Sequence, residues 1–224
     1  MHRARDLLIR RRTQLVDMMR GLLAEFGIDI PEGLGRALVM AQQVADGAAP
    51  EMPVAAAKVV GMLSRQALDT HARLLDLDRA LLALQRTDDM ARRLSTIPGI
   101  GPIGATALAA SVTDPSQFRP GRQFAAWLGL TPLQNSGGGK ERLGRSSKMG
   151  DRYLRKLLVI GATSLVRRAR NRPEAVDHRL ANLLARKPVR LATVAMANKM
   201  ARIVWAAMTR GEVYQRSHAP MLAA

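Results

Sequence analysis

The sequence predicts an all-α fold, with an N-terminal helical arm followed by a compact helical domain. Hydrophobic residues make up 47% of the 224 residues but aromatic residues only 3%, so the core must be built from Leu, Ala, Val, Ile and Met. Ala, Leu and Met lose little side-chain freedom in a helix and therefore favour one. Apolar residues recur at helical spacing along most of the chain, whereas the best strand candidate, residues 124–130, fits a helix more easily.

The arm is expected to begin with two helices. Residues 2–26 have an amphipathic pattern, with arginines on the faces that the apolar residues leave open. Gly27 and Pro31 interrupt this pattern and end the first helix. A second, shorter helix is expected at 34–46, and a connection containing Gly and Pro follows it at 47–53.

One long helix is expected over residues 54–94. A short heptad seam runs along it, made by Ala67, Leu74, Leu77, Leu81 and Leu84. A seam of this kind pairs with another helix in a coiled coil, but packing of the helix on its own domain explains the same pattern equally well. The arm therefore predicts a homo-oligomer held through the N-terminal helices, with packing inside one chain as the alternative.

The composition changes near residue 95, where Gly and Pro become frequent and basic residues begin to accumulate. We therefore expect a helical arm at 1–94, a second helical domain at 95–213 and a loose tail at 214–224. Three further helices are expected in the second domain, at residues 151–170, 173–186 and 188–210.

The charge of the chain is strongly positive and unevenly placed. Lys and Arg number 35 against 18 Asp and Glu, which gives a net charge of +17. Residues 119–172 contain 13 basic and 2 acidic residues and so hold +11 of this excess. A merely solvated face would mix the two signs, whereas an excess of one sign is typical of a surface that binds a polyanion such as DNA.

Several functional classes are disfavoured by the residues present. The chain has no cysteine, and its four histidines are scattered without the spacing of metal ligands, so we expect no metal site and no cofactor in it. It has no apolar run long enough to cross a bilayer and no signal peptide at its start. We therefore expect no membrane partner and a cytoplasmic protein, associated with the nucleoid if it binds DNA.

Residues 94–112 resemble a helix-hairpin-helix DNA-binding motif. One helix ends, a tight turn follows, and a second helix begins near Pro102. Glycines let a backbone approach the sugar-phosphate chain, and the start of the second helix offers free N–H groups to a phosphate. Ile97 and Ile100 are expected to be buried beneath the turn. The predicted contacts to the DNA backbone are Pro98, Gly99, Gly101 and Gly104. The alternative is a turn whose glycines allow close helix packing and bind nothing.

A serine loop with many cations follows. Three glycines come directly after Ser136, and Gly137 and Gly138 would let the loop fold closely around a ligand. The basic residues expected to bind phosphates are Lys140, Arg142, Arg145, Lys148, Arg152 and Arg155. A serine surrounded by cations can attack a phosphodiester and hold the strand as a phosphoserine. By spacing alone, however, a serine in such a loop is more often a simple turn residue.

The stretch from Leu94 to about Val213 resembles the C-terminal transposase domain of the IS110/IS1111 family, also called IS116/IS110/IS902. The order and spacing of several short motifs agree with that family: Ile97–Gly101, Phe124–Pro132, Asn135–Lys140, Leu143–Gly144, Lys148–Asp151 and Tyr153–Arg155. The N-terminal stretch, with three consecutive arginines at 10–12, resembles the middle region of the same family.

The resemblance implies site-specific cutting and rejoining of DNA. It implies a serine nucleophile at Ser136, with Ser146 and Ser147 as less favoured candidates, and a guide RNA as a further partner. It also implies an upstream RuvC-like domain with four acidic residues and divalent metal, Mg²⁺, that this sequence does not contain. The chain is therefore expected to be a truncated transposase with little or no strand transfer by itself.

Two functional hypotheses follow from these observations. The first is the DNA-binding part of an insertion-sequence transposase, which becomes an enzyme only when an acidic RuvC-like domain completes it. The alternative is a non-enzymatic helix-hairpin-helix DNA-binding or regulatory module. A protein that binds single-stranded RNA is less favoured, because few aromatic residues are available to stack on bases.

Overall fold

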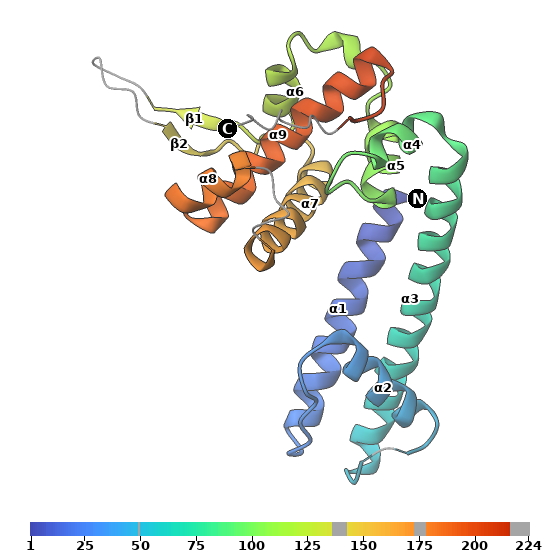
Figure 1. Ribbon diagram of the computed structural model, residues 1–224. Coiled ribbons are helices and arrows are strands. Elements are labelled where there is room, and N and C mark those ends of the chain that lie inside the picture. Colours follow the sequence, from blue (N-terminus) through green and yellow to red (C-terminus); the bar gives the residue numbers. More distant parts are fainter. Residues whose placement is uncertain (49, 136–142, 173–177, 216–224) are drawn as a thin grey trace. The chain divides into compact units, whose positions relative to one another are not determined.

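The computed structural model describes residues 1–48, 50–135, 143–172 and 178–215. In these residues the chain forms nine α-helices, one short 3-10 turn and a single two-stranded sheet (Figure 1). The expected all-α fold is therefore confirmed, with a small β addition. Contacts divide the chain into two compact units, which we call unit 1 (Met1–Leu81) and unit 2 (Leu82–Ala224). The expected domain boundary near residue 94 stays a prediction.

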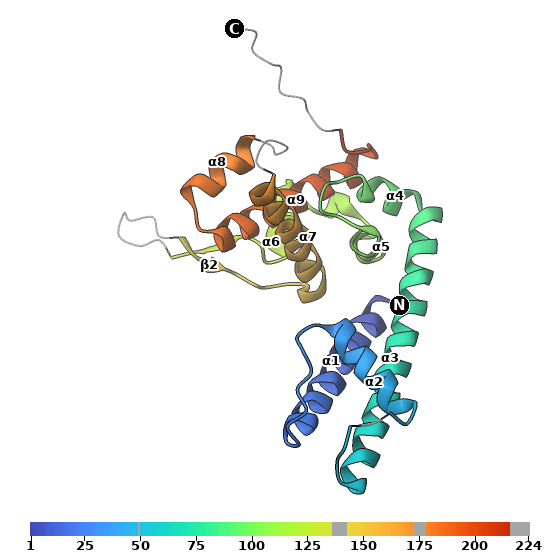
Figure 2. The same cartoon turned by 60° about the horizontal axis from the view of Figure 1, so that its bottom comes forward.

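Unit 1 contains α1 (His2–Ala24), α2 (Leu34–Ala45) and most of α3 (Val54–Thr87). In both ribbon views α1 and α3 run alongside each other and α2 lies near one end of them (Figures 1 and 2). The helices are joined by one apolar core, whose most buried members are Met19, Leu23, Ala37, Ala41, Val60 and Ala67. The first two helices lie where helical spacing places them.

Polar contacts also connect α1 to α3. Arg5 forms an ion pair with Asp78, and Nη1 of Arg12 lies 2.9 Å from Nδ1 of His71. Burial, followed by the charge of Arg12, lowers the pKa of His71. These contacts fix the first half of α1 against α3.

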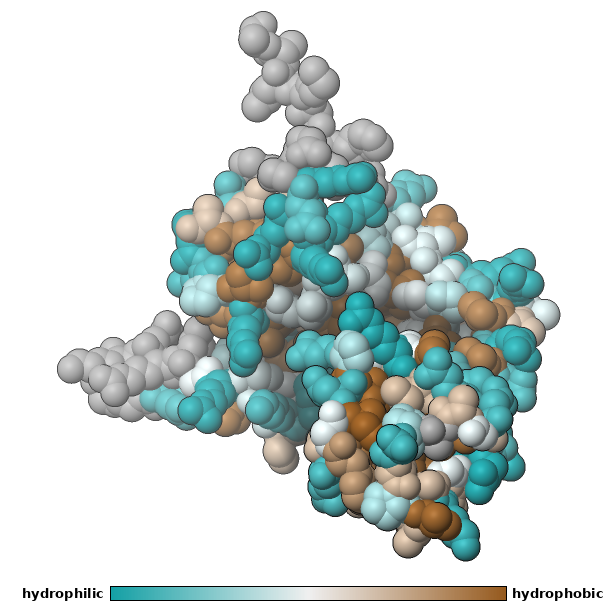
Figure 3. Space-filling view, turned by 90° about the horizontal axis from the view of Figure 1, so that it is seen from below, coloured by the Kyte–Doolittle hydropathy of each residue, from teal (hydrophilic) through white to brown (hydrophobic). Residues whose placement is uncertain are grey.

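Unit 1 also exposes apolar side chains. Val39 on α2, and Val54, Val59 and Met62 on α3, all have more than two-fifths of their surface exposed. Figure 3 looks at the molecule from below and shows hydrophobic patches among hydrophilic residues over this unit. By contrast, Ala67, Leu74 and Leu81 of the expected heptad seam are buried inside the single chain. Packing within one chain therefore accounts for these three residues.

The single helix expected over 54–94 is wrong, because the chain breaks at Asp88. The helix α3 ends at Thr87, and α4 (Asp89–Ser95) begins after one intervening residue. The carboxylate of Asp88 accepts a hydrogen bond of 2.7 Å from the amide of Ala91. An aspartate favours this capping position because its short side chain satisfies an amide that has no partner in the first helical turn.

Unit 2 is built around its last helix, α9 (Val189–Arg210). It packs against α6 (Gly121–Trp127), α7 (Arg152–Asn171) and α8 (His178–Arg186) (Figure 1). Two other helices complete the unit, α4 and α5 (Pro102–Ser111), with the 3-10 turn η1 (Pro115–Gln117) after them. The largest fully buried side chains of this core are Phe124, Leu94, Ile97, Leu108, Leu128, Leu154, Leu158 and Met200. None of the helices in the described ranges is long and apolar enough to cross a membrane.

A short antiparallel sheet interrupts the helical unit. Strand β1 (Pro132–Gln134) pairs with β2 (Leu143–Ser146), with Pro132 opposite Ser146 and Gln134 opposite Leu143. The register is irregular between these two pairs. Neither strand is predicted from the sequence, because segments of three and four residues are too short to establish an alternating pattern.

Candidate nucleic-acid interface

Two motif segments pass over each other in close contact, and we call this contact the crossing (residues 127–131 and 146–151). A Cβ atom at Gly129 would lie 2.0 Å from the carbonyl oxygen of Met149, and one at Gly150 would lie 1.7 Å from that of Trp127. Real Cβ atoms do not come so close, so both positions require glycine. Gly150 also has a φ of +88°, which disfavours any side chain.

Backbone and hydroxyl hydrogen bonds join the two segments of the crossing. The amide of Ser147 donates to the carbonyl of Thr131 at 2.9 Å, and the amide of Lys148 donates to the carbonyl of Gly129 at 3.1 Å. The hydroxyl of Ser146 donates to the same Gly129 carbonyl at 2.6 Å. The crossing therefore continues the pairing of β1 and β2 as far as α7.

Three side chains hold the crossing in place. Nη1 of Arg155 donates to the carbonyls of Leu128 at 3.0 Å and Met149 at 3.1 Å, one on each segment. Asp151 caps α7 by accepting bonds from the first amides of that helix. Nδ2 of Asn198 on α9 donates to the carbonyl of Leu130 at 3.2 Å. The base of the strand pair is thus fixed to both α7 and α9.

The predicted loop residues divide between described and undescribed parts of the chain. Five of them lie outside the described residues: Ser136, Gly137, Gly138, Lys140 and Arg142. Strand β1 ends two residues before Ser136, and β2 begins at Leu143. The ends of the loop that carries Ser136 are therefore held next to each other by the strand pair.

The remaining predicted cations do not share one environment. Arg145, Lys148 and Arg152 are exposed, on β2, on the crossing and at the start of α7. Arg155 is half-buried, and its guanidinium binds the two carbonyls of the crossing. Three cations thus lie on the surface near the base of the loop, while the fourth supports the backbone beneath it.

The less favoured serines are both part of the crossing. Ser146 donates its hydroxyl to a backbone carbonyl, so its oxygen is held there. The amide of Ser147 donates to the carbonyl of Thr131 and so continues the strand pairing, while the nearby start of α7 is capped by Asp151.

The turn between α4 and α5 has a buried side and an open side. Ile97 and Ile100 are buried, as the sequence predicts. On the same side, a Cβ atom at Gly99 would lie 3.0 Å from the carbonyl oxygen of Gly161, and one at Gly161 would lie 2.0 Å from that of Gly99. Close packing of the turn on α7 therefore explains the need for glycine at position 99.

The open side of the turn is the start of α5. Gly101 is exposed and caps the helix, and Pro102 occupies its first position. A Cβ atom at Gly101 would meet nothing within 4 Å, and one at Gly104 only a methyl group of Ile100 at 3.5 Å. The amides of the first turn have no partner within the helix, so this end of α5 can accept an anion. Pro98, at the tip of the turn, is also exposed.

Three carboxylates in the described part of unit 2 bind backbone amides. Asp88, Asp114 and Asp151 each accept a bond from a backbone amide at the start of a helix or 3-10 turn. The hydroxyl and the amide of Ser116 lower the pKa of Asp114. Across the described ranges, no three His, Asp or Glu side chains come together in a way that could hold a metal ion.

Sequence reasoning missed the residues that support the site from a distance. Gly161 and Met200 meet the turn at Gly99, and Asn198 supports the crossing. Each acts through a contact between segments far apart in the chain. The only sequence signal was a glycine within an otherwise regular helical pattern at position 161.

Comparison with known proteins places this architecture in a family. Residues 91–177, which include the turn and the crossing, match the model of the Transposase IS116/IS110/IS902 family. A Pseudomonas aeruginosa protein described as "Probable family 20 transposase" is 46% identical over 96% of this chain and 64% of its own length. A related protein of Sinorhizobium fredii is 42% identical over 95% of this chain and 55% of its own length.

A third relative carries the name of an insertion sequence. The transposase for insertion sequence element IS1111A of Coxiella burnetii is 37% identical over 94% of this chain and 58% of its own length. The chain thus spans between 55% and 64% of the length of these three relatives. Because the identity extends over nearly the whole chain, the chain belongs to the IS116/IS110/IS902 family of transposases.

Proposed function

We propose that unit 2 is the DNA-binding part of a site-specific insertion-sequence transposase. The observation that supports this most is the group of exposed cations Arg145, Lys148 and Arg152 beside the serine loop, while nearby Asp151 is occupied as a helix cap. Cations exposed on the surface in this way attract the phosphates of a nucleic acid. The contacts would be to the DNA backbone and would carry little sequence information.

The start of α5 is the second proposed contact. Its free amides and its positive dipole end favour a phosphate oxygen, and Gly101 and Gly104 leave space for the backbone of a strand to approach. Gly99 would contribute indirectly in this arrangement, by seating the turn on α7 so that the start of α5 stays open.

Ser136 is the proposed nucleophile. Its Oγ would form a bond to the phosphorus of a DNA phosphodiester, the bond from phosphorus to the 3′ oxygen would break, and that oxygen would take up a proton. The strand would remain attached as a phosphoserine, and the nearby cations would stabilise the charge on the phosphoryl group. The strand pair and the crossing would limit the movement of both ends of the loop.

This step requires groups that the described residues do not bring together. We propose that an acidic RuvC-like domain completes the site and supplies carboxylates for Mg²⁺, so that the chain alone transfers little or no DNA. A guide RNA is a further proposed partner. A cytoplasmic, nucleoid-associated location would follow from DNA binding.

We also propose that the chain forms a homo-oligomer through unit 1. The support for this is an exposed apolar surface and not the heptad seam, three residues of which are buried within one chain. The exposed residues Val54, Val59 and Met62 of α3 offer an apolar surface that a second chain can cover.

The alternative function is a non-enzymatic DNA-binding or regulatory module, which the open start of α5 also supports. Both functions predict DNA binding, so only covalent attachment through Ser136 separates them. Loss of the serine hydroxyl should leave DNA affinity unchanged under either one.

Binding by the full chain to a short DNA duplex tests the proposal, measured by fluorescence anisotropy over a range of salt concentrations. We expect the triple variant Arg145→Gln/Lys148→Gln/Arg152→Gln to lower the slope of log affinity against log salt by about 2 to 3. The proposal fails if the unsubstituted chain does not bind, or if the slope does not change.

A control variant in unit 1 tests whether the change in slope comes from the proposed phosphate contacts or only from the lower net charge of the protein. Arg73 and Arg79 are exposed on α3 in unit 1, each beside an aspartate. The variant Arg73→Gln/Arg79→Gln should change the slope by less than about 0.5.

A further inference from the structure

We propose that a groove between α6, α8 and α9 of unit 2 is a second binding site for a nucleic-acid phosphodiester backbone, separate from the serine loop and from the start of α5. The groove has a volume of about 740 Å³. It contains none of the residues predicted from the sequence to bind DNA. The inference rests on the proposed function, because it assumes that unit 2 handles nucleic acid.

Four cations contribute to the lining of the groove, one from α6, one from α8 and two from α9. They are Arg122, Arg186, Lys199 and Arg202, and no Asp or Glu lines the groove in the described part of the chain. Arg122, Arg186 and Arg202 have exposed side chains. Such an excess of positive charge in a concave surface concentrates the field and favours a polyanion.

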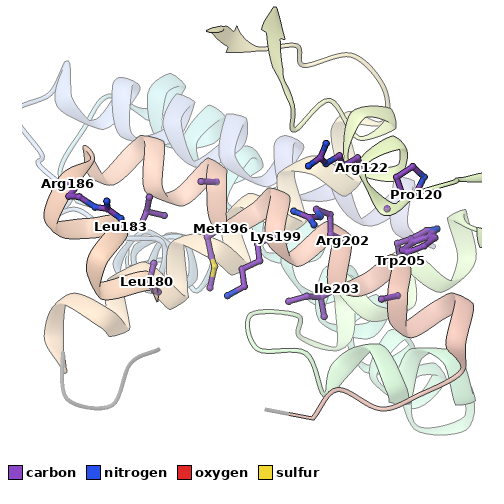
Figure 4. A pocket seen from close by; sticks show the side chains of 13 residues that line it. Pro120, Arg122, Leu180, Leu183, Arg186, Met196, Lys199, Arg202, Ile203 and Trp205 are labelled. Atoms are coloured by element: carbon purple, nitrogen blue, oxygen red, sulfur yellow. The ribbon is translucent and has the colours of Figure 1, made fainter. Parts of the chain in front are cut away.

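The cations are spread along the groove. Figure 4 shows Arg186 near one end, Lys199 in the middle, and Arg122 and Arg202 further toward the end where Pro120 and Trp205 lie. A single small anion needs cations that converge on one point, whereas a strand presents its charges at repeated intervals. The arrangement therefore fits the phosphates of a strand better than one isolated phosphate.

The floor of the groove is apolar and firmly packed. The indole N–H of Trp205 donates to the carbonyls of Pro115 at 3.2 Å and Phe118 at 3.0 Å. A Cβ atom at Gly121 would lie 2.8 Å from a ring carbon of Trp205, so α6 starts directly against the indole. This packing holds Arg122, the next residue, in a fixed relation to α9.

The spacing of the two cations on α9 also supports phosphate binding in the groove. Lys199 and Arg202 are three residues apart and therefore project from one side of the helix. On another side of α9, Ala197, Met200 and Ala201 are buried in the core of unit 2. The helix thus presents charge to the groove while its other side stabilises the fold.

The test is the salt dependence of binding to a short DNA duplex, a DNA single strand and an RNA strand of the same sequence, all with the full chain. We expect Arg122→Gln/Arg202→Gln to lower the slope of log affinity against log salt by about 1.8 with the duplex or by about 1.4 with a single strand. The nucleic acid that shows this loss is the one that occupies the groove. The variant Arg122→Lys/Arg202→Lys should restore the slope, since a lysine also neutralises a phosphate.

The control variant Arg73→Gln/Arg79→Gln removes the same charge from exposed positions of unit 1 and should change the slope little. Thermal melting of each variant, followed by circular dichroism, checks the fold. The inference is overturned if the groove variant keeps the slope for all three nucleic acids, or if the control loses as much. The proposed function fails separately, if the unsubstituted chain binds none of the three.

Discussion

Helical glycines of unit 1 and motif glycines of unit 2 differ in their surroundings. In unit 1, a Cβ atom added to Gly21 or Gly35 would meet no other atom within 4 Å. In unit 2, a Cβ atom added to Gly129, Gly150 or Gly161 would lie 2.0 Å or less from a carbonyl oxygen of another segment. At these positions glycine therefore lies on open helix surface in the first unit and in backbone contact in the second.

In unit 2 the glycines of the sequence motifs lie where two segments of the backbone are in contact. Gly129 and Gly150 belong to the two segments of the crossing, and Gly99 belongs to the turn that packs on Gly161. The glycines of these motifs thus occupy positions where segments far apart in the sequence are in close backbone contact. Chemistry at the serine loop would depend on the contacts of the crossing, because they fix the base of the strand pair that flanks the loop.

The largest expected effect is at Gly150. Gly150→Ala adds a methyl group where the Trp127 carbonyl oxygen lies and requires a left-handed conformation of an alanine. We expect unit 2 to lose about 4 kcal/mol of unfolding free energy. Denaturation by urea measures this loss, and the fluorescence of Trp127 and Trp205 reports on unit 2, which contains both tryptophans of the chain. A loss below about 1 kcal/mol would contradict the crossing.

Gly161→Ala is expected to cost about 3 kcal/mol, because its methyl group would overlap the carbonyl of Gly99. Gly104→Ala is the matched control in the same unit, since its methyl group meets only Ile100 at an ordinary distance. This control should change stability by no more than about 1 kcal/mol. Equal losses for the two variants, in the same urea titration, would remove the proposed difference between contact and open glycines.

Two arginines of α7 differ in the same way: Arg155 is in contact with backbone carbonyls, whereas Arg152 is exposed. Arg155→Ala removes hydrogen bonds to the carbonyls of Leu128 and Met149 and should cost about 2 kcal/mol. Arg152→Ala, on the exposed surface, should change stability by less than about 0.5 kcal/mol but weaken DNA binding. Urea denaturation and anisotropy on both variants would show opposite rankings, and the same ranking in both assays would refute the division of roles.

The smallest expected effect is a gain in unit 1. Gly21→Ala replaces a poor helix former inside α1 where no neighbour opposes the methyl group. We expect stabilisation by about 0.5 to 1 kcal/mol, measured by far-ultraviolet circular dichroism during urea denaturation. Destabilisation would mean that α1 has a close neighbour at this position.

The comparison also explains which features the sequence predicts. Helical spacing places α1, α2 and α9 within two residues of their ends, and the burial of Ile97 and Ile100 follows from their position in the turn. These features depend on neighbours in the sequence. The break at Asp88 depends on one capping hydrogen bond, and a continuous apolar pattern across it conceals the break.

The parts of the site that sequence could not provide all depend on distant contacts. Arg155 resembles a surface cation in a helical pattern, and only the carbonyls of the crossing reveal its supporting role. Arg122 and Arg202 lie 80 positions apart in the sequence and line one groove only after α6 packs on α9. Neither relation leaves a local pattern.

The most direct test of the account is whether Ser136 forms a covalent bond to DNA. The part of the Pseudomonas aeruginosa relative that this chain does not cover would be joined to the chain, with that full-length relative as positive control. Labelled DNA attached to protein would be measured on a denaturing gel. We predict an adduct that Ser136→Ala abolishes and Ser147→Ala retains, with DNA affinity unchanged in both. An adduct that persists in Ser136→Ala would contradict the account.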